Sequence, residues 1–215
     1  MLLINFKTYP QAIGPNALKL THKLLEETRD FPQVEVGFAP PSLELAEVAA
    51  HTQTNIWAQH TDPTGEGQST GFLSPSDAKA AGAVGTFLNH SEHPLSRETI
   101  AQTLQIAHEA GLKVLIFAKD PGEVADFATF KPDFIAYEPP ELIGGDVSVS
   151  TAKVQVIIDA ANAAKGIPLL VGAGIHARHD IEVALDLGAV GAVVSSAVVT
   201  AENPAEVFRN LLSEF

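Results

Sequence analysis

Short hydrophobic runs alternate with longer amphipathic stretches along the whole chain. The runs are rich in β-branched and aromatic residues, and almost every position within them is apolar. This pattern is typical of strands that helices cover on both faces, because neither face of such a strand meets water. We therefore predict strands at Leu2–Phe6, Val34–Ala39, Ile56–Gln59, Thr86–Asn89, Val114–Ala118, Phe134–Tyr137, Leu169–Val171 and Ala192–Ser195.

The stretches between these runs repeat their apolar residues with helical spacing, as Leu20 and Leu24 do. The predicted helices are Ala17–Thr28, Thr99–Ala110, Ile181–Leu187 and Ala205–Leu212. Capping residues are expected at Ser42 and Ser96 for N-termini, and at Gly111 and Gly188 just past C-termini.

About eight strand–helix units in a chain of 215 residues favour an α/β fold, a closed (β/α)8 TIM barrel, over an open doubly wound sheet. The glycine-rich turn that follows the first strand of many open sheets is absent, and Asn5-Phe6-Lys7 stands in its place. No linker or close repeat divides the chain, so we expect residues 1–215 to form a single (β/α)8 barrel catalytic domain.

Charge and composition narrow the possible partners. The formal net charge of −13 argues against nucleic acid and against an anionic membrane surface, which both require clustered basic residues. The chain has no cysteine, which excludes disulfides and thiolate metal sites. The first apolar run ends at Asn5 without a preceding basic segment, and no run approaches the roughly 20 residues of a membrane span. We expect a cytoplasmic protein.

Polar residues gather where the predicted strands end, which is where barrel enzymes build their active sites. They are Asn5 and Lys7 after the first strand, Asn89-His90-Ser91-Glu92 after the fourth, Glu138 after the sixth, Gly172–Ile175 after the seventh, and Ser195 and Ser196 after the eighth. Any one of them alone has an ordinary structural explanation. Together, a lysine, a histidine and a glutamate on three strand ends indicate catalysis. The glycine and serine turns after the last two strands are typical of a phosphate site.

These motifs resemble the triosephosphate isomerase family, in its shorter archaeal form. The resemblance runs from Asn5 to about Ser196 and includes Asn89–Glu92 and Tyr137–Gly144. It implies an isomerase that interconverts dihydroxyacetone phosphate and D-glyceraldehyde 3-phosphate through an enediolate, in glycolysis and gluconeogenesis, without a cofactor or a metal. A carbon-bound proton next to a carbonyl is weakly acidic, so this reaction needs a carboxylate whose basicity is raised in a dry site.

The resemblance also implies a role for each residue. Glu138 is the base, His90 is the electrophile, and Asn5 and Lys7 contact the substrate. The substrate- and phosphate-binding positions are Asn5, Phe6, Lys7, Ile143, Gly144, Gly174, Ser195 and Ser196. Glu92 supports Lys7, and Pro139–Gly144 matches a closing lid. The family is the standard example of a histidine that stays neutral because it lies at a helix N-terminus, and the resemblance implies the same for His90. The residues after His90 are compatible with such a helix.

The segment from His60 to Ser74 carries three glycines and neither a strand nor a helix pattern. Loops of this length in compact domains are usually functional or disordered. We expect it to become ordered on a second subunit, because Thr70 matches the threonine that family dimers insert into the neighbouring active site. Assembly beyond a dimer, to a tetramer, is left open, and a mobile surface loop is the alternative.

Three departures from the family pattern leave the reaction itself untouched. Phe117 stands where a cysteine is usual, His93-Pro94 replaces a basic pair, and Gly145-Asp146 replaces a Thr-Gly pair after the lid.

Three other kinds of protein stay open. A metal-dependent barrel hydrolase would use His60, Asp62, His90, Glu138, His176 and His179. An isomerase of amino-acid biosynthesis would typically use aspartate pairs, and a non-catalytic barrel would have no need of Lys7, His90 or Glu138.

Overall fold

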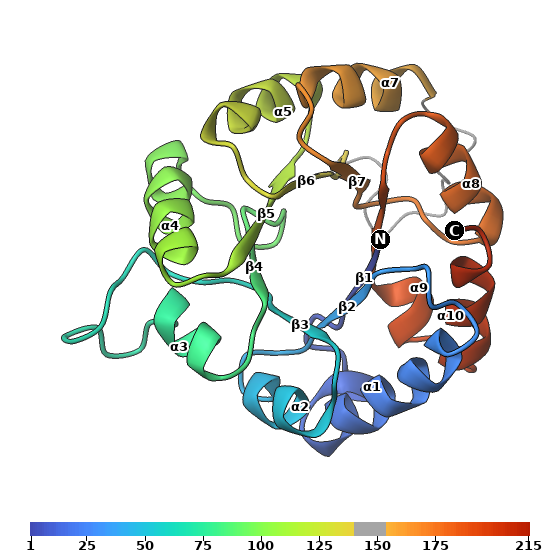
Figure 1. Cartoon of the computed structure of the whole chain (residues 1–215), viewed down its shortest axis with the longest axis horizontal. Helices are drawn as coiled ribbons and strands as arrows, with labels where there is room; N and C mark the ends of the chain where they lie inside the picture. The colour runs from blue at the N-terminus through green and yellow to red at the C-terminus, as the bar shows by residue number, and fades with distance from the viewer. Residues whose placement is uncertain (140–153) are drawn as a thin grey trace.

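Eight parallel strands close into a barrel in chain order in the computed structural model, which describes residues 1–139 and 154–215 (Figure 1). The strands are β1 (Leu2–Asn5), β2 (Val36–Ala39), β3 (Asn55–Ala58), β4 (Gly85–Leu88), β5 (Lys113–Ala118), β6 (Phe134–Tyr137), β7 (Leu169–Val171) and β8 (Gly191–Val194). The predicted fold class is confirmed, and each predicted strand lies within two residues of an observed one.

Helices form a ring around this barrel (Figure 1). They are α1 (Pro15–Thr28), α2 (Leu45–His51), α3 (Pro75–Ala80), α4 (Arg97–Glu109), α5 (Pro121–Phe127), α7 (Val154–Ala163), α8 (Arg178–Asp186), α9 (Ser196–Val199) and α10 (Pro204–Leu212), with 3₁₀ turns η1 (Pro10–Ala12) and η2 (Ala128–Phe130).

The sheet separates two apolar cores. Residues that point inward, among them Trp57, Phe87 and Leu170, fill the barrel, while the alternate residues pack against the helices. Trp57 fits inside because Gly85 has no side chain: a Cβ there would lie 2.4 Å from the indole. Burial on both faces explains why the strands are apolar throughout their length.

Helix boundaries follow local signals in most places. The Ser96 hydroxyl accepts a hydrogen bond from the Thr99 N–H at 3.1 Å, as a helix N-cap should. Gly111 and Gly188 adopt positive φ just past the ends of α4 and α8, as predicted. The prediction for Ser42 was wrong. A turn separates Ser42 from α2, and the helix begins after Glu44 without a side-chain cap.

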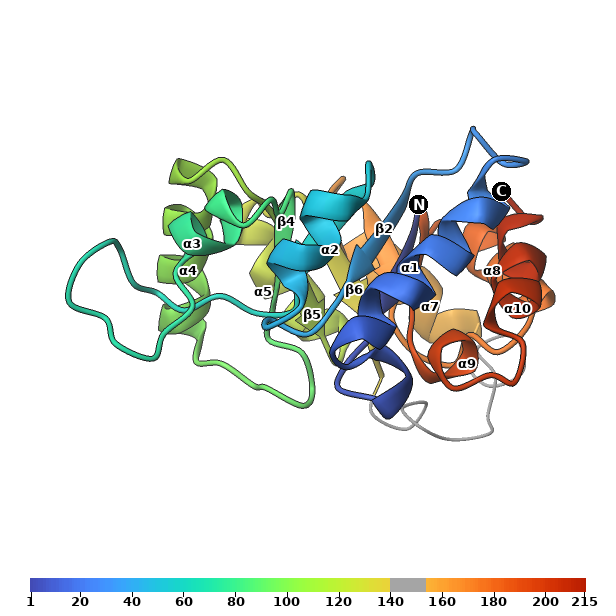
Figure 2. The same ribbon diagram turned by 90° about the horizontal axis from the view of Figure 1, so that it is seen from below.

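The segment between β3 and α3 projects well beyond the ring of helices, as the teal loop shows in both views (Figures 1 and 2). Two hydrogen bonds of 2.8 Å close the base of this loop. The Asp62 N–H donates to the Leu73 carbonyl, and the Leu73 N–H donates to the Asp62 carboxylate.

Within residues 1–139 and 154–215, no helix is long and apolar enough to span a membrane.

Candidate active site

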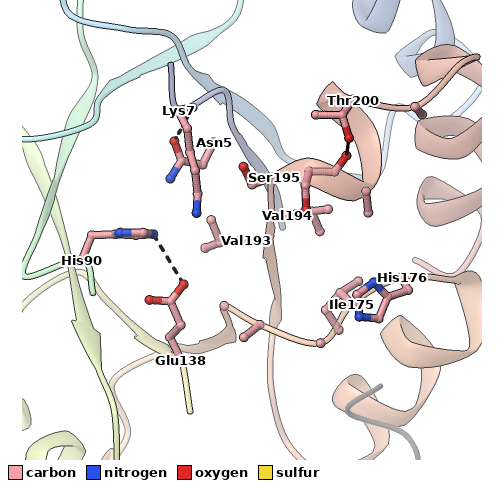
Figure 3. Close-up of a pocket in the computed structure, with 16 residues that line it drawn as sticks. Asn5, Lys7, His90, Glu138, Ile175, His176, Val193, Val194, Ser195 and Thr200 are labelled. Carbon is pink, nitrogen blue, oxygen red and sulfur yellow. Dashed lines mark hydrogen bonds and ion pairs between the residues drawn. The ribbon is translucent and has the colours of Figure 1, made fainter. Parts of the chain in front are cut away.

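A cavity of about 350 Å³ opens at the carboxyl ends of the strands. The residues that line it are Asn5, Lys7, His90, Glu138, Gly172–His176, Val193–Ala197, Thr200 and Ala201. They come from the ends of β1, β4, β6, β7 and β8 and from α9 with the two residues after it, segments that the closed sheet brings together. His90 and Glu138 face each other on one side of the cavity, across from His176 and Thr200 (Figure 3).

Glu138 directly follows β6, and its main chain continues the sheet by donating to the Ala118 carbonyl at 2.8 Å. Its side chain is buried, and burial raises the pKa of this carboxyl to about 7, against the opposing effects of hydrogen bonding from Ser91 and of the Lys7 charge. Gly172 leaves room for it, since a Cβ there would lie 3.3 Å from that of Glu138. Such a group can accept and release a proton near neutral pH.

His90 presents its Nε2 atom to the Glu138 carboxylate, with 3.4 Å between Nε2 and Oε1 (Figure 3). Its other ring nitrogen, Nδ1, accepts a hydrogen bond from the Glu92 N–H at 3.1 Å. Burial, followed by the charge of Lys7, lowers the pKa of His90 to about 4, although Glu92 opposes this change. The ring is therefore a neutral imidazole with its proton on Nε2.

The surroundings of this imidazole differ from the prediction in one respect. The residues after His90 form a turn, in which the His93 N–H donates to the His90 carbonyl at 2.7 Å, and α4 begins only at Arg97. The helix expected directly after His90 is therefore not there, and the N–H that meets Nδ1 belongs to a turn. The ring also contacts Phe117 edge to face, with 4.8 Å between centroids, so the phenylalanine that departs from the family pattern helps to fix the imidazole.

Lys7 lies on the same side of the cavity as His90 and forms an ion pair with Glu92, 2.8 Å between Nζ and Oε1. Its N–H donates to the Asn5 side-chain oxygen at 3.0 Å. Asn5 itself is buried at the end of β1. The predicted pairing of Lys7 with Glu92 is therefore present, and it holds a positive charge beside the carboxylate of Glu138.

The turns after β7 and β8 form another part of the cavity wall. Gly174 adopts φ 72°, which turns the chain sharply after β7. The Ser195 hydroxyl is buried and has no hydrogen-bond partner among the described residues. A buried hydroxyl of this kind costs free energy unless a ligand or water satisfies it. The Ser195 hydroxyl therefore lies available for a ligand in the wall where the sequence predicts the phosphate-binding site.

Several predicted residues lie elsewhere. Phe6 is fully buried and packs against Phe38, with 6.0 Å between ring centroids, so it does not line the cavity. Thr70 is exposed on the projecting loop. Ile143 and Gly144, with Gly145-Asp146 and the lid beyond Pro139, lie outside the described residues.

Sequence reasoning missed other residues that the structure brings to the site. Thr200 lines the cavity and was not predicted. His176, which the sequence suggested only as a metal ligand, also lines the cavity, and its position directly after the Gly172–Ile175 motif could have indicated this. Ser91, which hydrogen-bonds to Glu138, was visible only as part of a motif.

The ligand set considered for a metal does not assemble. In the part of the chain that the structure describes, no three His, Asp or Glu side chains are grouped so as to hold a metal ion. His60 instead contacts Asp62 at 3.2 Å and stacks on His93, with 4.1 Å between ring centroids. The interpretation as a metal-dependent hydrolase therefore finds no ligand cluster within residues 1–139 and 154–215.

Comparison with known proteins gives a consistent result. A family model described as triosephosphate isomerase matches residues 1–214. A triosephosphate isomerase of Thermoplasma volcanium is 36% identical over 213 residues, which is 98% of each chain. One of Saccharolobus solfataricus is 37% identical over 216 residues, covering 99% of this chain and 95% of the relative. The crystal structure of triosephosphate isomerase from Bartonella henselae aligns with a TM-score of 0.76 at 19% identity, covering 99% and 97% of the two chains, a likeness of fold alone.

Proposed function

The chain belongs to the triosephosphate isomerase family, and on that premise we propose that Glu138 and His90 carry out the family's reaction in the cavity at the strand ends. The enzyme interconverts dihydroxyacetone phosphate and D-glyceraldehyde 3-phosphate, a step of glycolysis and gluconeogenesis. The observation that carries the proposed mechanism is the contact of 3.4 Å between a buried carboxylate and the Nε2 of a neutral imidazole.

Glu138 acts on the carbon-bound proton. Its carboxylate removes a proton from the carbon next to the carbonyl, and the electron pair of the broken C–H bond forms the double bond of the enediolate. The protonated Glu138 then returns the proton to the neighbouring carbon, while a proton exchanges between the two oxygens. A raised pKa suits both halves of this transfer, because the group must be a base in one step and an acid in the other.

His90 and Lys7 act on the charge that develops on oxygen. A neutral imidazole donates its Nε2 proton to the enediolate oxygen, and the Lys7 ammonium adds a positive charge nearby. Preorganised donors of this kind lower the barrier because they need no reorganisation during the reaction. Asn5 orients Lys7 through the hydrogen bond to its N–H.

The phosphate of the substrate would bind on the opposite wall. Gly174, Ser195 and Ser196 form the turns there, and the buried Ser195 hydroxyl is a donor without a partner among the described residues. Ile143 and Gly144 complete the phosphate site in this proposal, as part of a lid over the substrate. Residues 1–215 would make up one catalytic domain, working in the cytoplasm without a cofactor.

The projecting loop supports a homodimer. Thr70 and Phe72 are exposed on this loop, and Phe72 has 55% of its surface accessible. The loop packs little against its own subunit, and contact with a second subunit would cover Phe72. We place Thr70 in the active site of the partner subunit, where it would help to hold the lysine and the histidine in position.

A coupled isomerase assay on the wild type and on Glu138→Gln tests the mechanism. The amide cannot accept the proton, so kcat should fall by about 100- to 10,000-fold, the usual contribution of a general base. Glu202→Gln, an exposed carboxylate outside the cavity, is the matched control and should keep full activity. Near-wild-type kcat in Glu138→Gln would eliminate Glu138 as the base, and an inactive wild type would contradict the function itself.

A further inference from the structure

The side chain of Gln59 reaches the main chain of Lys7. Gln59 directly follows β3, and its Nε2 donates two hydrogen bonds, to the Lys7 carbonyl at 3.0 Å and to the Ala39 carbonyl at 2.9 Å. The Ala39 carbonyl, at the end of β2, also accepts the Phe6 N–H at 3.0 Å. One carboxamide therefore joins the ends of three neighbouring strands at the point where the chain leaves β1.

Lys7 has an unusual backbone conformation at this point. Its φ is 45°, in the left-handed region that residues other than glycine seldom adopt. Strained residues of this kind persist only where the surroundings hold them in place, and they concentrate at functional sites. The conformation matters here because it directs the ammonium group toward His90 and Glu138 (Figure 3).

Side chains hold each polar group of Lys7. Asn5 accepts from its N–H at 3.0 Å, Glu92 pairs with its Nζ at 2.8 Å, and Gln59 donates to its carbonyl. Within residues 1–139 and 154–215, no other group donates to that carbonyl. Asn5 and Glu92 belong to motifs already assigned to the site, whereas Gln59 touches neither the cavity nor the reacting groups.

We propose that Gln59 is a positioning residue for Lys7, and that its carboxamide keeps the lysine main chain in the left-handed conformation that the reaction requires. The inference rests on the proposed function. Without the carboxamide, the Lys7 backbone relaxes toward negative φ and moves Nζ away from the substrate. Displacement of a catalytic group by about 1 Å can lower the rate on the order of a hundredfold.

The expected kinetic effect is specific. The positive charge of Lys7 attracts the anionic substrate in the ground state and also stabilises the charge that develops in the transition state, so its displacement should raise KM and lower kcat. Gln59 does not contact Glu138 or His90, so the two groups that handle the substrate protons stay in place. Removal of the carboxamide should therefore lower kcat/KM by about tenfold or more, through a higher KM as well as a lower kcat, with a parallel rise in the Kd of phosphoglycolate.

Gln59→Met tests the proposal, because methionine has the same length and no hydrogen-bond donor. The matched control is Thr61→Val, which removes the bond of 3.2 Å from the Thr61 hydroxyl to that of Thr86, buried in the same segment and without contact to Lys7. Both variants should lower Tm, but only Gln59→Met should raise KM and the Kd of phosphoglycolate. Gln59→Asn, which withdraws the amide by one methylene, repeats the test with a milder change if the methionine variant does not fold.

Unchanged KM and Kd in the folded Gln59 variants would overturn the proposal, as would an equal rise in Thr61→Val. A wild type that is inactive on triose phosphates would contradict the proposed function instead. The Kd of phosphoglycolate, measured by calorimetry, needs no turnover and decides the role of Gln59 in that case too.

Discussion

The Glu92 main chain sets the protonation state of His90: its N–H donates to Nδ1 at 3.1 Å, which leaves the ring proton on Nε2, 3.4 Å from Glu138. A nitrogen that accepts a hydrogen bond in this way carries no proton, so the ring is neutral. Burial and the charge of Lys7 act in the same direction. The site thus holds a donor that does not need to be a cation.

His90 should remain neutral throughout the physiological range. Its pKa is lowered to about 4, so the ring nitrogens should show the Nε2–H tautomer from pH 8 down to about pH 5 in a ¹⁵N NMR titration. His179 is an internal control, because hydrogen bonding to Glu182 raises its pKa and it should titrate at higher pH. Titration of His90 near its ordinary value of 6.5 would contradict the assignment.

Glu138→Gln should be more stable than the wild type above neutral pH. The pKa of Glu138 is raised from 4.5 to about 7, so its favourable contribution to folding is complete below pH 4.5 and is lost as pH rises to about 7. The variant should gain at most about 3 kcal/mol over the wild type at pH 8 and little at pH 4. Thermal melts across this range measure the effect, and a difference in Tm independent of pH would show that the carboxylate is not desolvated.

Phosphoglycolate should protect the folded protein by mass action. A concentration of about 100 times Kd adds about 2.7 kcal/mol to the free energy of unfolding, which corresponds to several degrees in Tm for a chain of this size. Ser195→Ala should reduce the shift, because the buried hydroxyl is the free donor of that wall. Glycolate, which lacks the phosphate, is the control ligand. Absence of any shift at millimolar phosphoglycolate would argue against the phosphate site.

Thr70→Arg should move the protein toward a monomer and lower kcat at the same time. An arginine at this exposed position of the loop is too large for the place of the threonine in the partner's active site, which loses the support of Thr70. Size-exclusion chromatography with light scattering and the coupled assay measure the two effects together. Asn162→Arg, on the exposed face of α7, adds the same charge and should change neither. A fully active monomer would disprove the intersubunit role.

The strands were predictable because their burial on both faces makes them apolar without interruption, and the site was predictable because its residues stand at strand ends. The errors have local causes. Ser42 has the chemistry of an N-cap, but a turn intervenes before α2. The short helices α3 and α5 show no clear periodicity, although Ser74-Pro75 and Asp120-Pro121 carry a start signal, and both caps form.

Contacts between distant segments were beyond the reach of local patterns. The hydrogen bond from Gln59 to Lys7 depends on the order of β1, β2 and β3 around the barrel, and on Lys7 adopting positive φ. The protonation state of His90 likewise depends on a turn whose N–H happens to meet Nδ1, which residue types alone do not specify.

The pairing of β1 with β8 ties the start of the barrel to its last strand. The Ala192 N–H donates to the Met1 carbonyl at 3.1 Å, and the Met1 amino group donates to the Val190 carbonyl, 189 positions away. During synthesis on the ribosome, β1 leaves the exit tunnel long before its neighbour exists. Its open edge stays available to other unfinished chains throughout that time, because unpaired strands are templates for aggregation. The closed sheet brings the catalytic residues together, so the active site cannot assemble until β8 has been synthesised.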